Sequence, residues 1–287
     1  MWRSIAASWV APVEDRPEHA ADPRLDGRTV LAVFAHPDDE SLACGGTLAR
    51  LTDAGARVIL LCASRGEAGS VSDPALVPDG DLGAVRTREL HQAAAILGVH
   101  EVLVMDHPDG DLRWDDVPEL HGEIVGAIQH YRPDAVVTFD ADGLYWHLDH
   151  VGVHERTFTA VRSLGVDAPA LYYVTMLEGS MREIMNAAHA KGGVAPDSGM
   201  WGITPDVFGY SAKPPTLSVD VRRWVPRKLA ALRCHRTQMG GRDHPIAWID
   251  EEDARRWLGF EYFRRADVAG GPMLILEQLG EPATRDA

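Results

Sequence analysis

The chain has 287 residues, with 28 Lys and Arg against 43 Asp and Glu, so its formal net charge is −15. This acidic balance argues against a protein that binds nucleic acid through phosphate contacts, and against one that inserts into or adheres to an anionic membrane. Its hydrophobic fraction of 45% excludes a disordered polyanion. Three widely spaced cysteines favour a reducing compartment over a disulfide scaffold. We expect a soluble, cytoplasmic protein, and the sequence leaves its oligomeric state open.

The elements follow one another in an alternating order. Residues 1–27 predict an irregular lead-in to a single domain that spans residues 1–287, and buried strands and amphipathic helices then alternate. The predicted strands are 29–35, 57–63, 101–105, 135–139 and 171–175, and the predicted helices are 41–54, 84–97, 118–131 and 149–164. Beyond them we expect a helix over 180–191, a loop-rich segment over 192–215, a strand over 217–221, a helix over 225–239 and a late strand over 272–278.

This order predicts an α/β fold. We expect a Rossmann-like, mostly parallel sheet with helices on both faces and a decorated C-terminal third. Open parallel sheets bind ligands at the carboxyl ends of their strands. Polar segments follow the first, second and fourth predicted strands at residues 36–40, 64–67 and 140–150. The sequence therefore places a candidate site at one edge of the sheet.

The residues at that edge suit a catalytic metal. His36, Asp39 and His150 provide two imidazoles and one carboxylate, a three-ligand set that leaves positions open for water or substrate. His147 lies three residues before His150 at a predicted helix start, so both can face the same point. Asp38 provides a second carboxylate that is free to act as a base. As alternatives, Asp38 or Asp39 could cap a helix.

The segments Ala35-His36-Pro37-Asp38-Asp39-Glu40 and His147-Leu148-Asp149-His150 resemble those of the PIG-L/LmbE family of metal-dependent de-N-acetylases. The resemblance extends from about residue 29 to residue 239. It implies a Rossmann-like fold with a zinc-type site at His36, Asp39 and His150, with Fe²⁺ or another divalent metal as alternatives. It also implies that the enzyme removes an N-acetyl or related N-acyl group from a small N-acetylglucosaminyl compound, its one expected partner.

The resemblance also implies a role for each catalytic residue. Asp38 would be the general base for a metal-activated water, and His147 would stabilise the oxyanion of the tetrahedral intermediate. Asp149 would orient His147. Either Asp38 or His147 would protonate the departing amine, and the sequence does not choose between them.

Three further positions resemble substrate contacts of the family. Arg86 belongs to an R-x-x-E segment with Glu89, and a surface ion pair between the two is the alternative. Tyr145 matches an aromatic residue near the reacting carbonyl, although a packing role is nearly as plausible. His235 belongs to a late family motif whose His lies near the pocket, with a structural role as the alternative. The loops 67–83 and 192–215 would flank the pocket mouth and determine specificity.

Other functions fit parts of the sequence. The substrate could be a thiol-sugar conjugate, cleaved by an amidase, or a natural-product amino sugar. Two His and one carboxylate also define non-haem Fe(II) oxygenases, which usually use an antiparallel barrel. A nucleotide-binding oxidoreductase or methyltransferase would need a glycine-rich turn where His36-Pro37-Asp38-Asp39 stands. A catalytically silent sugar-binding relative would be expected to lack the base or a ligand.

Overall fold

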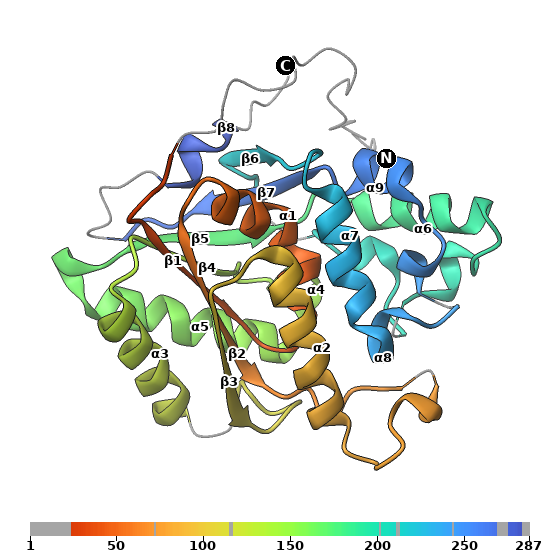
Figure 1. Cartoon of the computed structure of the whole chain (residues 1–287), viewed down its shortest axis with the longest axis horizontal. Helices are drawn as coiled ribbons and strands as arrows, with labels where there is room; N and C mark the ends of the chain where they lie inside the picture. The colour runs from red at the N-terminus through yellow and green to blue at the C-terminus, as the bar shows by residue number, and fades with distance from the viewer. Residues whose placement is uncertain are drawn as a thin grey trace, which may run out of the picture.

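A computed structural model describes residues 24–71, 73–114, 117–200, 202–210, 213–242, 244–268 and 275–282 (Figure 1). Its strands are β1 (Thr29–Phe34), β2 (Arg57–Ser64), β3 (Glu101–His107), β4 (Ala135–Phe139), β5 (Ala170–Thr175), β6 (Leu217–Asp220), β7 (Phe260–Arg265) and β8 (Glu281–Pro282). Its α-helices are α1 (Asp39–Asp53), α2 (Leu82–Leu97), α3 (Val117–Tyr131), α4 (Gly143–Trp146), α5 (Leu148–Ser163), α6 (Ser180–Ala190), α7 (Val225–Cys234), α8 (Arg236–Met239) and α9 (Glu251–Trp257).

Short 3₁₀ turns complete the connections. They are η1 (Pro74–Leu76), η2 (Gly165–Asp167), η3 (Pro196–Ser198), η4 (Pro205–Val207), η5 (Pro245–Ala247) and η6 (Leu276–Gln278). No helix in the part of the chain that the structure describes is long and apolar enough to cross a membrane. Most of the predicted lead-in lies outside the described residues, and the division into one domain stays a prediction.

The eight strands lie in the order β3-β2-β1-β4-β5-β7-β6-β8. The strands from β3 to β5 are parallel to one another, which confirms the Rossmann-like prediction, whereas β7 runs antiparallel to both β5 and β6. The direction in which the strands are added along the chain reverses between β1 and β4. Strands β2 and β3 lie on one side of β1, and β4 and β5 lie on the other. Such a reversal opens a crevice at the carboxyl ends of the two strands.

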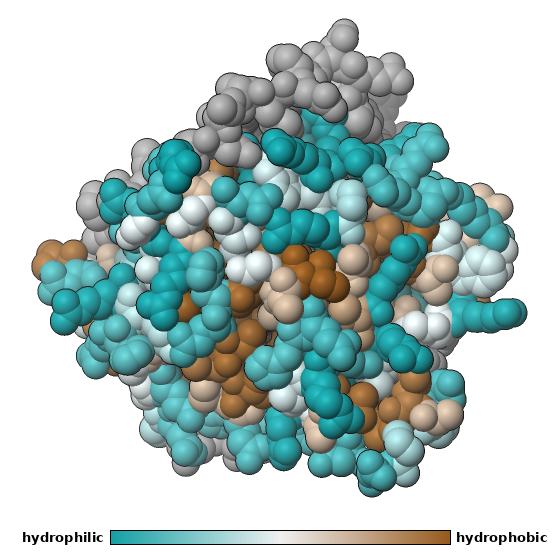
Figure 2. Space-filling view, in the orientation of Figure 1, coloured by the Kyte–Doolittle hydropathy of each residue, from teal (hydrophilic) through white to brown (hydrophobic). Residues whose placement is uncertain are grey.

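Helices cover the sheet on both sides. Figure 1 shows α1, α2 and α7 packed together on one side of the sheet, and α3 and α5 on the other. All residues of β4 and β5 are buried, as expected for strands covered on both faces. A second hydrophobic cluster lies in the C-terminal third, among α6, α7, α9 and η5. Hydrophilic residues cover most of the face seen in Figure 2, with smaller hydrophobic groups between them.

The C-terminal third differs from the sequence prediction in three places. The helix predicted over 225–239 is interrupted at His235, which has ψ 59° and separates α7 from α8. The strand predicted over 272–278 is wrong at residues 276–278, which form η6, and residues 272–274 lie outside the described residues. Helix α9 and strand β7 were not predicted, and β7 joins the C-terminal strands to the parallel sheet.

Helix α1 bends at Cys44, whose φ of −150° and ψ of 24° are not helical. The bend leaves backbone N–H groups without helical acceptors. The Glu261 carboxylate on β7 accepts from Gly46 N at 2.9 Å and from Thr47 N at 2.7 Å. Lys228 Nζ donates to the same carboxylate at 2.6 Å, and both side chains are at most 3% exposed. A buried ion pair therefore connects β7 and α7 to the helix that follows β1.

We expect Lys228→Met to lower the free energy of unfolding by about 3–5 kcal/mol, because it leaves the Glu261 carboxylate buried without a cation. Chemical denaturation followed by circular dichroism measures this change. Adding Glu261→Gln should restore much of the loss, since a neutral amide oxygen still accepts from the backbone. Lys213→Met, on an exposed lysine, is the control. An unchanged denaturation midpoint for Lys228→Met would contradict the prediction.

Candidate active site

Two imidazoles and one carboxylate meet beyond the carboxyl ends of β1 and β4. His36 follows β1, Asp39 begins α1, and His150 lies in the first turn of α5. His150 Nε2 lies 3.1 Å from Asp39 Oδ1 and 3.3 Å from His36 Nδ1, and His36 Nδ1 lies 3.5 Å from Asp39 Oδ2. Ligands of one tetrahedral zinc ion, with bonds of 2.0–2.1 Å, lie about 3.3 Å apart. The two imidazole nitrogens have this separation, and each oxygen of Asp39 lies within 3.5 Å of one of them, so the three side chains face one another. His147 lies close enough to His36 and His150 for the three imidazoles to form a candidate ligand group as well.

The orientation of the His36 ring is fixed by hydrogen bonds at Nε2, the nitrogen that faces away from Asp39 and His150. Its Nε2 lies 3.0 Å from Asp149 Oδ2 and 3.1 Å from Asp109 Oδ1 and donates to these carboxylates, while Nδ1 faces Asp39 and His150. Burial lowers the pKa of His36, but the hydrogen bonds with Asp109, Asp149 and Asp39 raise it well above its usual value. Carboxylates placed in this way orient metal-binding histidines and raise their basicity.

The tautomer of His150 is fixed in a similar way. Its Nδ1 donates to the Gly143 carbonyl oxygen at 3.1 Å, and its Nε2 faces Asp39. The Phe139 ring stacks on the imidazole with a centroid distance of 4.0 Å. Gly143 has a φ of +56°, and a Cβ there would lie 2.8 Å from that of His150. The turn after β4 therefore needs glycine at this position.

Asp39 is held as a carboxylate between the two imidazoles. Burial raises its pKa, but His150 and His36 have the larger combined effect and lower it well below the usual value. Its Oδ2 also accepts from the backbone N of His36 at 2.7 Å. An ionised carboxylate is the form that binds a cation.

Asp38 occupies a strained turn beside the donor set formed by His36, Asp39 and His150. Its φ of 125° is rare for any residue other than glycine, and such strain occurs preferentially at functional sites. Burial raises the pKa of Asp38 to about 6, against the opposing effect of Arg86. Glu40 Oε2 accepts from the Asp38 backbone N at 3.0 Å and supports the turn.

His147 and Tyr145 lie next to the donor set. The His147 ring stacks on His150 with a centroid distance of 4.6 Å, and burial together with His150 lowers its pKa to about 4. Its Nδ1 is buried and has no hydrogen-bond partner among the residues that the structure describes. The Tyr145 ring contacts both Phe208, at 4.6 Å, and His150, at 5.2 Å, so it packs against the core and faces the site. Leu144 and Trp146 also have positive φ values, 67° and 64°.

The structure corrects the expected role of Asp149. Its carboxylate accepts from Gly110 N at 2.8 Å and Leu112 N at 3.0 Å, and it contacts His36 rather than His147. Asp149 therefore orients a predicted metal ligand, because it lies on the far side of His36 from the donor set.

Two of the predicted substrate contacts, Arg86 and His235, are buried and bind other groups of the protein. His235 is 0% exposed, and its Nε2 lies 2.9 Å from Glu40 Oε1, beneath the catalytic turn. Burial lowers the pKa of His235, but Glu40 raises it above its usual value. Arg86 is 4% exposed and donates to Gly66 O at 2.8 Å, Pro37 O at 2.7 Å and Asp38 Oδ2 at 3.2 Å. Both side chains therefore position Asp38 from within the protein.

Glu89 does not form the surface ion pair with Arg86 that was the alternative to a substrate contact. Its carboxylate accepts from Thr237 N at 3.0 Å and Thr237 Oγ1 at 2.6 Å, which fastens α8 to α2.

The sequence analysis did not predict one residue that lies in the candidate site. Asp109 Oδ1 contacts His36, and its Oδ2 accepts from Ala68 N at 2.9 Å. Asp109 follows β3, so the rule that functional residues follow the carboxyl ends of parallel strands could have found it. The prediction applied that rule to the first, second and fourth strands and not to the third.

Comparisons with known proteins assign the chain to a family. Residues 31–161 match the family model PIG-L, described as GlcNAc-PI de-N-acetylase. A curated protein of Kineococcus radiotolerans, named 1D-myo-inositol 2-acetamido-2-deoxy-α-D-glucopyranoside deacetylase, is 36% identical over 82% of this chain and 76% of its own length. The chain belongs to the PIG-L family.

Two solved structures share the fold with this PIG-L protein. The N,N'-diacetylchitobiose deacetylase of Pyrococcus horikoshii aligns with a TM-score of 0.57 and 24% identity over 83% of this chain and 84% of its own. A 4-carboxy-2-hydroxymuconate hydratase of Pseudomonas putida aligns with a TM-score of 0.59 and 18% identity over 86% of this chain and 98% of its own. The fold thus occurs with different reactions, and the reaction must be argued from the site.

We expect Asp149→Asn to weaken zinc binding about 10–100-fold, because His36 loses the carboxylate that fixes its orientation and raises its basicity. Titration of zinc against a competing chelator measures the affinity. Asp167→Asn, at an exposed position after α5, should leave the affinity unchanged. Equal affinities of Asp149→Asn and the unmodified protein would show that Asp149 has no such role.

Proposed function

We propose that this chain is a metal-dependent N-deacetylase that hydrolyses the acetamide of a small N-acetylglucosaminyl compound. The observation that carries the proposal is the convergence of His36, Asp39 and His150, with the carboxylate of Asp38, held by Arg86, beside them. The relative from Kineococcus radiotolerans, whose name specifies this chemistry, supports the reaction and the substrate class.

His36, Asp39 and His150 would hold the cation, with zinc as our first choice and Fe²⁺ or another divalent metal as alternatives. When bound, a divalent cation polarises the amide carbonyl and lowers the pKa of water so that a nucleophile forms near neutral pH. The convergence of two imidazoles and one carboxylate, with the far side of each imidazole hydrogen-bonded, supports this assignment.

The residues of the chain would divide the proton transfers and charge stabilisation. Asp38 accepts the proton of the attacking water while the new C–O bond forms. His147 donates a hydrogen bond to the carbonyl oxygen as it becomes negatively charged. The C–N bond then breaks, acetate leaves, and the amine nitrogen takes a proton from Asp38 or from His147. Tyr145 borders the same space, and Asp149, Arg86 and His235 hold these groups in place.

The rival functions fit less well. The open parallel sheet differs from the antiparallel barrel usual for a non-haem Fe(II) oxygenase. A silent sugar-binding relative is disfavoured because the proposed base and all three proposed ligands are present, and the proposed ligands lie close together. Release of amine and acetate under anaerobic conditions would exclude the oxygenase, and turnover of any acetamido sugar would exclude the silent relative.

We expect His150→Ala to lose the bound metal, since it removes one of three ligands. Elemental analysis of the purified protein measures the metal content. His154→Ala, one turn further along α5, is the matched control and should keep the metal. Full metal content in His150→Ala would contradict the ligand assignment.

We expect Asp38→Ala to keep its metal and to lose about 10²–10⁴-fold in turnover, as is usual when a general base is removed. The assay follows primary amine released from N-acetylglucosamine, from its myo-inositol glycoside and from N,N'-diacetylchitobiose. The same assay on unmodified protein tests the proposed reaction. Undiminished turnover by Asp38→Ala would refute its role as the base.

A further inference from the structure

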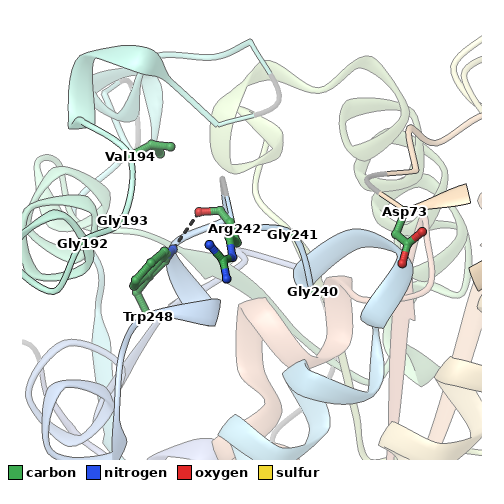
Figure 3. A pocket seen from close by; sticks show the side chains of 8 residues that line it. All are labelled: Asp73, Gly192, Gly193, Val194, Gly240, Gly241, Arg242 and Trp248. Carbon is green, nitrogen blue, oxygen red and sulfur yellow. Dashed lines mark hydrogen bonds between the residues drawn. The ribbon is translucent and has the colours of Figure 1, made fainter. Parts of the chain in front are cut away.

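In the proposed reaction, the sugar ring of the substrate lies next to His147. The acetamide nitrogen of an N-acetylglucosaminyl compound is bonded to a ring carbon, so the pyranose ring lies only two bonds from the reacting carbonyl carbon. The described residues that line the cavity in Figure 3 are Asp73, Trp248 and the segments 192–194 and 240–242, and they include none of the proposed ligands or catalytic residues. The neighbours of His147 are therefore better placed to meet the ring than the walls of this cavity.

Exposed apolar side chains gather around His147. Six large apolar side chains among the described residues are exposed, and two of them, Trp146 at 55% and Leu148 at 49%, directly flank His147. A third, Tyr210, follows a backbone N–H that donates to Leu144 O in the same turn at 3.0 Å. Exposed apolar side chains that cluster, unlike single ones, mark binding surfaces.

Trp146 is close to the reacting atoms. Its Cα lies about 3.8 Å from that of His147, the usual distance between consecutive residues. The centroid of the His147 ring lies 4.9 Å from that of His36 and 4.6 Å from that of His150. A pyranose ring whose acetamide carbonyl meets His147 therefore has Trp146 as a neighbour. Because Trp146 is more than half exposed, its indole has free surface on which the ring can pack.

The backbone of Trp146 has a conformation that suits glycine better than tryptophan. Its φ is 64°, a value that residues with a Cβ adopt at a cost in conformational free energy. Three other described residues without this freedom also have positive φ. The buried side chain of Leu144 and the hydrogen-bonded carboxylate of Asp38 make contacts that offset the cost, and Arg132 directly follows α3, where a left-handed residue commonly ends a helix. The exposed side chain of Trp146 has no comparable packing among the described residues, so the stability of the fold does not account for it.

The turn is held by its main chain and not by the indole. The backbone N of Trp146 donates to Asp142 O at 2.7 Å, and the Asp142 carboxylate accepts from Leu144 N at 3.2 Å. Gly143 O accepts from His150 Nδ1 at 3.1 Å. None of these hydrogen bonds uses the Trp146 side chain, so Trp146→Gly would keep them all.

We propose that Trp146 packs on the apolar C–H face of the pyranose ring that carries the acetamide, and that this contact, and not the stability of the turn, is the function of its side chain. The inference rests on the proposed deacetylase function. The C–H bonds on one face of a pyranose ring form an apolar surface, and an indole provides a large, rigid aromatic surface against it. The contact is the same in the ground state and the transition state, so it contributes to substrate binding and leaves the rate of the bound substrate unchanged.

The test measures amine release from N-acetylglucosamine and thermal unfolding of the same zinc-loaded proteins. We expect Trp146→Gly to raise the KM about tenfold and to leave the kcat unchanged, because it removes a contact that does not change during the reaction. The same variant should unfold about 2 °C higher, because it relieves the left-handed conformation. Trp146→Phe should keep most of the affinity and gain no stability. Val166→Ala, at an exposed position in η2 beyond the far end of α5, is the control and should change neither quantity.

Two results would overturn the inference directly. One is an unchanged KM in Trp146→Gly, and the other is a raised KM with a lower unfolding temperature, which would indicate a structural role. Sedimentation of the same proteins tests the other occupant of an exposed apolar surface, a second copy of this chain. Loss of an oligomer in Trp146→Gly with an unchanged KM would assign the side chain to a subunit interface instead.

A second readout does not depend on turnover. If the unmodified protein releases no amine from N-acetylglucosamine, the proposed function fails. Calorimetric titration of N-acetylglucosamine into zinc-loaded Asp38→Asn protein still tests the ring contact, because Trp146→Gly in that background should weaken binding about tenfold. Equal affinities with and without Trp146→Gly, or no binding to either protein, would contradict the contact.

Discussion

One buried carboxylate between two imidazoles is the constraint on which the rest of the site depends. A charged Asp39 is costly to bury unless its oxygens are paired, and His36, His150 and the His36 backbone N provide those partners. Each imidazole is in turn fixed at its other nitrogen, by Asp149 and Asp109 or by the Gly143 carbonyl. The protein's own hydrogen bonds thereby hold the donor atoms close together, which lowers the conformational cost of binding a cation.

The proposed base is held by a separate set of contacts. Asp38 lies in a strained turn whose conformation costs on the order of 1–3 kcal/mol, so surrounding contacts must maintain it. Arg86 holds the side chain, and Glu40, itself paired with His235, holds the backbone N. This division separates cation binding from proton transfer, because each function depends on its own set of hydrogen bonds.

Sequence reasoning predicted the parallel part of the fold and the residues at the end of β1 and β4. Those predictions succeeded because long apolar strands alternate with helices, and because functional residues follow the strands. Strand β7 was missed because its inward-facing residues include Glu261, a charge whose partners come from α1 and α7. The hydrogen-bond partners of His235, Arg86 and Asp149 could not be predicted from the sequence for a related reason. A sequence shows that a polar residue is present, but only the packed structure shows which side of another residue it faces.

The hydrogen bonds between α8 and α2 bear on how long a segment of the chain must be to form the candidate site. Residues 31–161, which match the family model, contain the whole donor triangle and the proposed base. Part of the support behind the proposed base nevertheless comes from outside that segment: His235 contacts Glu40, Thr237 donates to Glu89, and Gln238 donates to Ser70 O. A fragment limited to the matched residues would therefore carry every reactive group and lack the framework that aligns them. The C-terminal third, which the sequence predicted as a decoration of the sheet, therefore contributes contacts that support the candidate site.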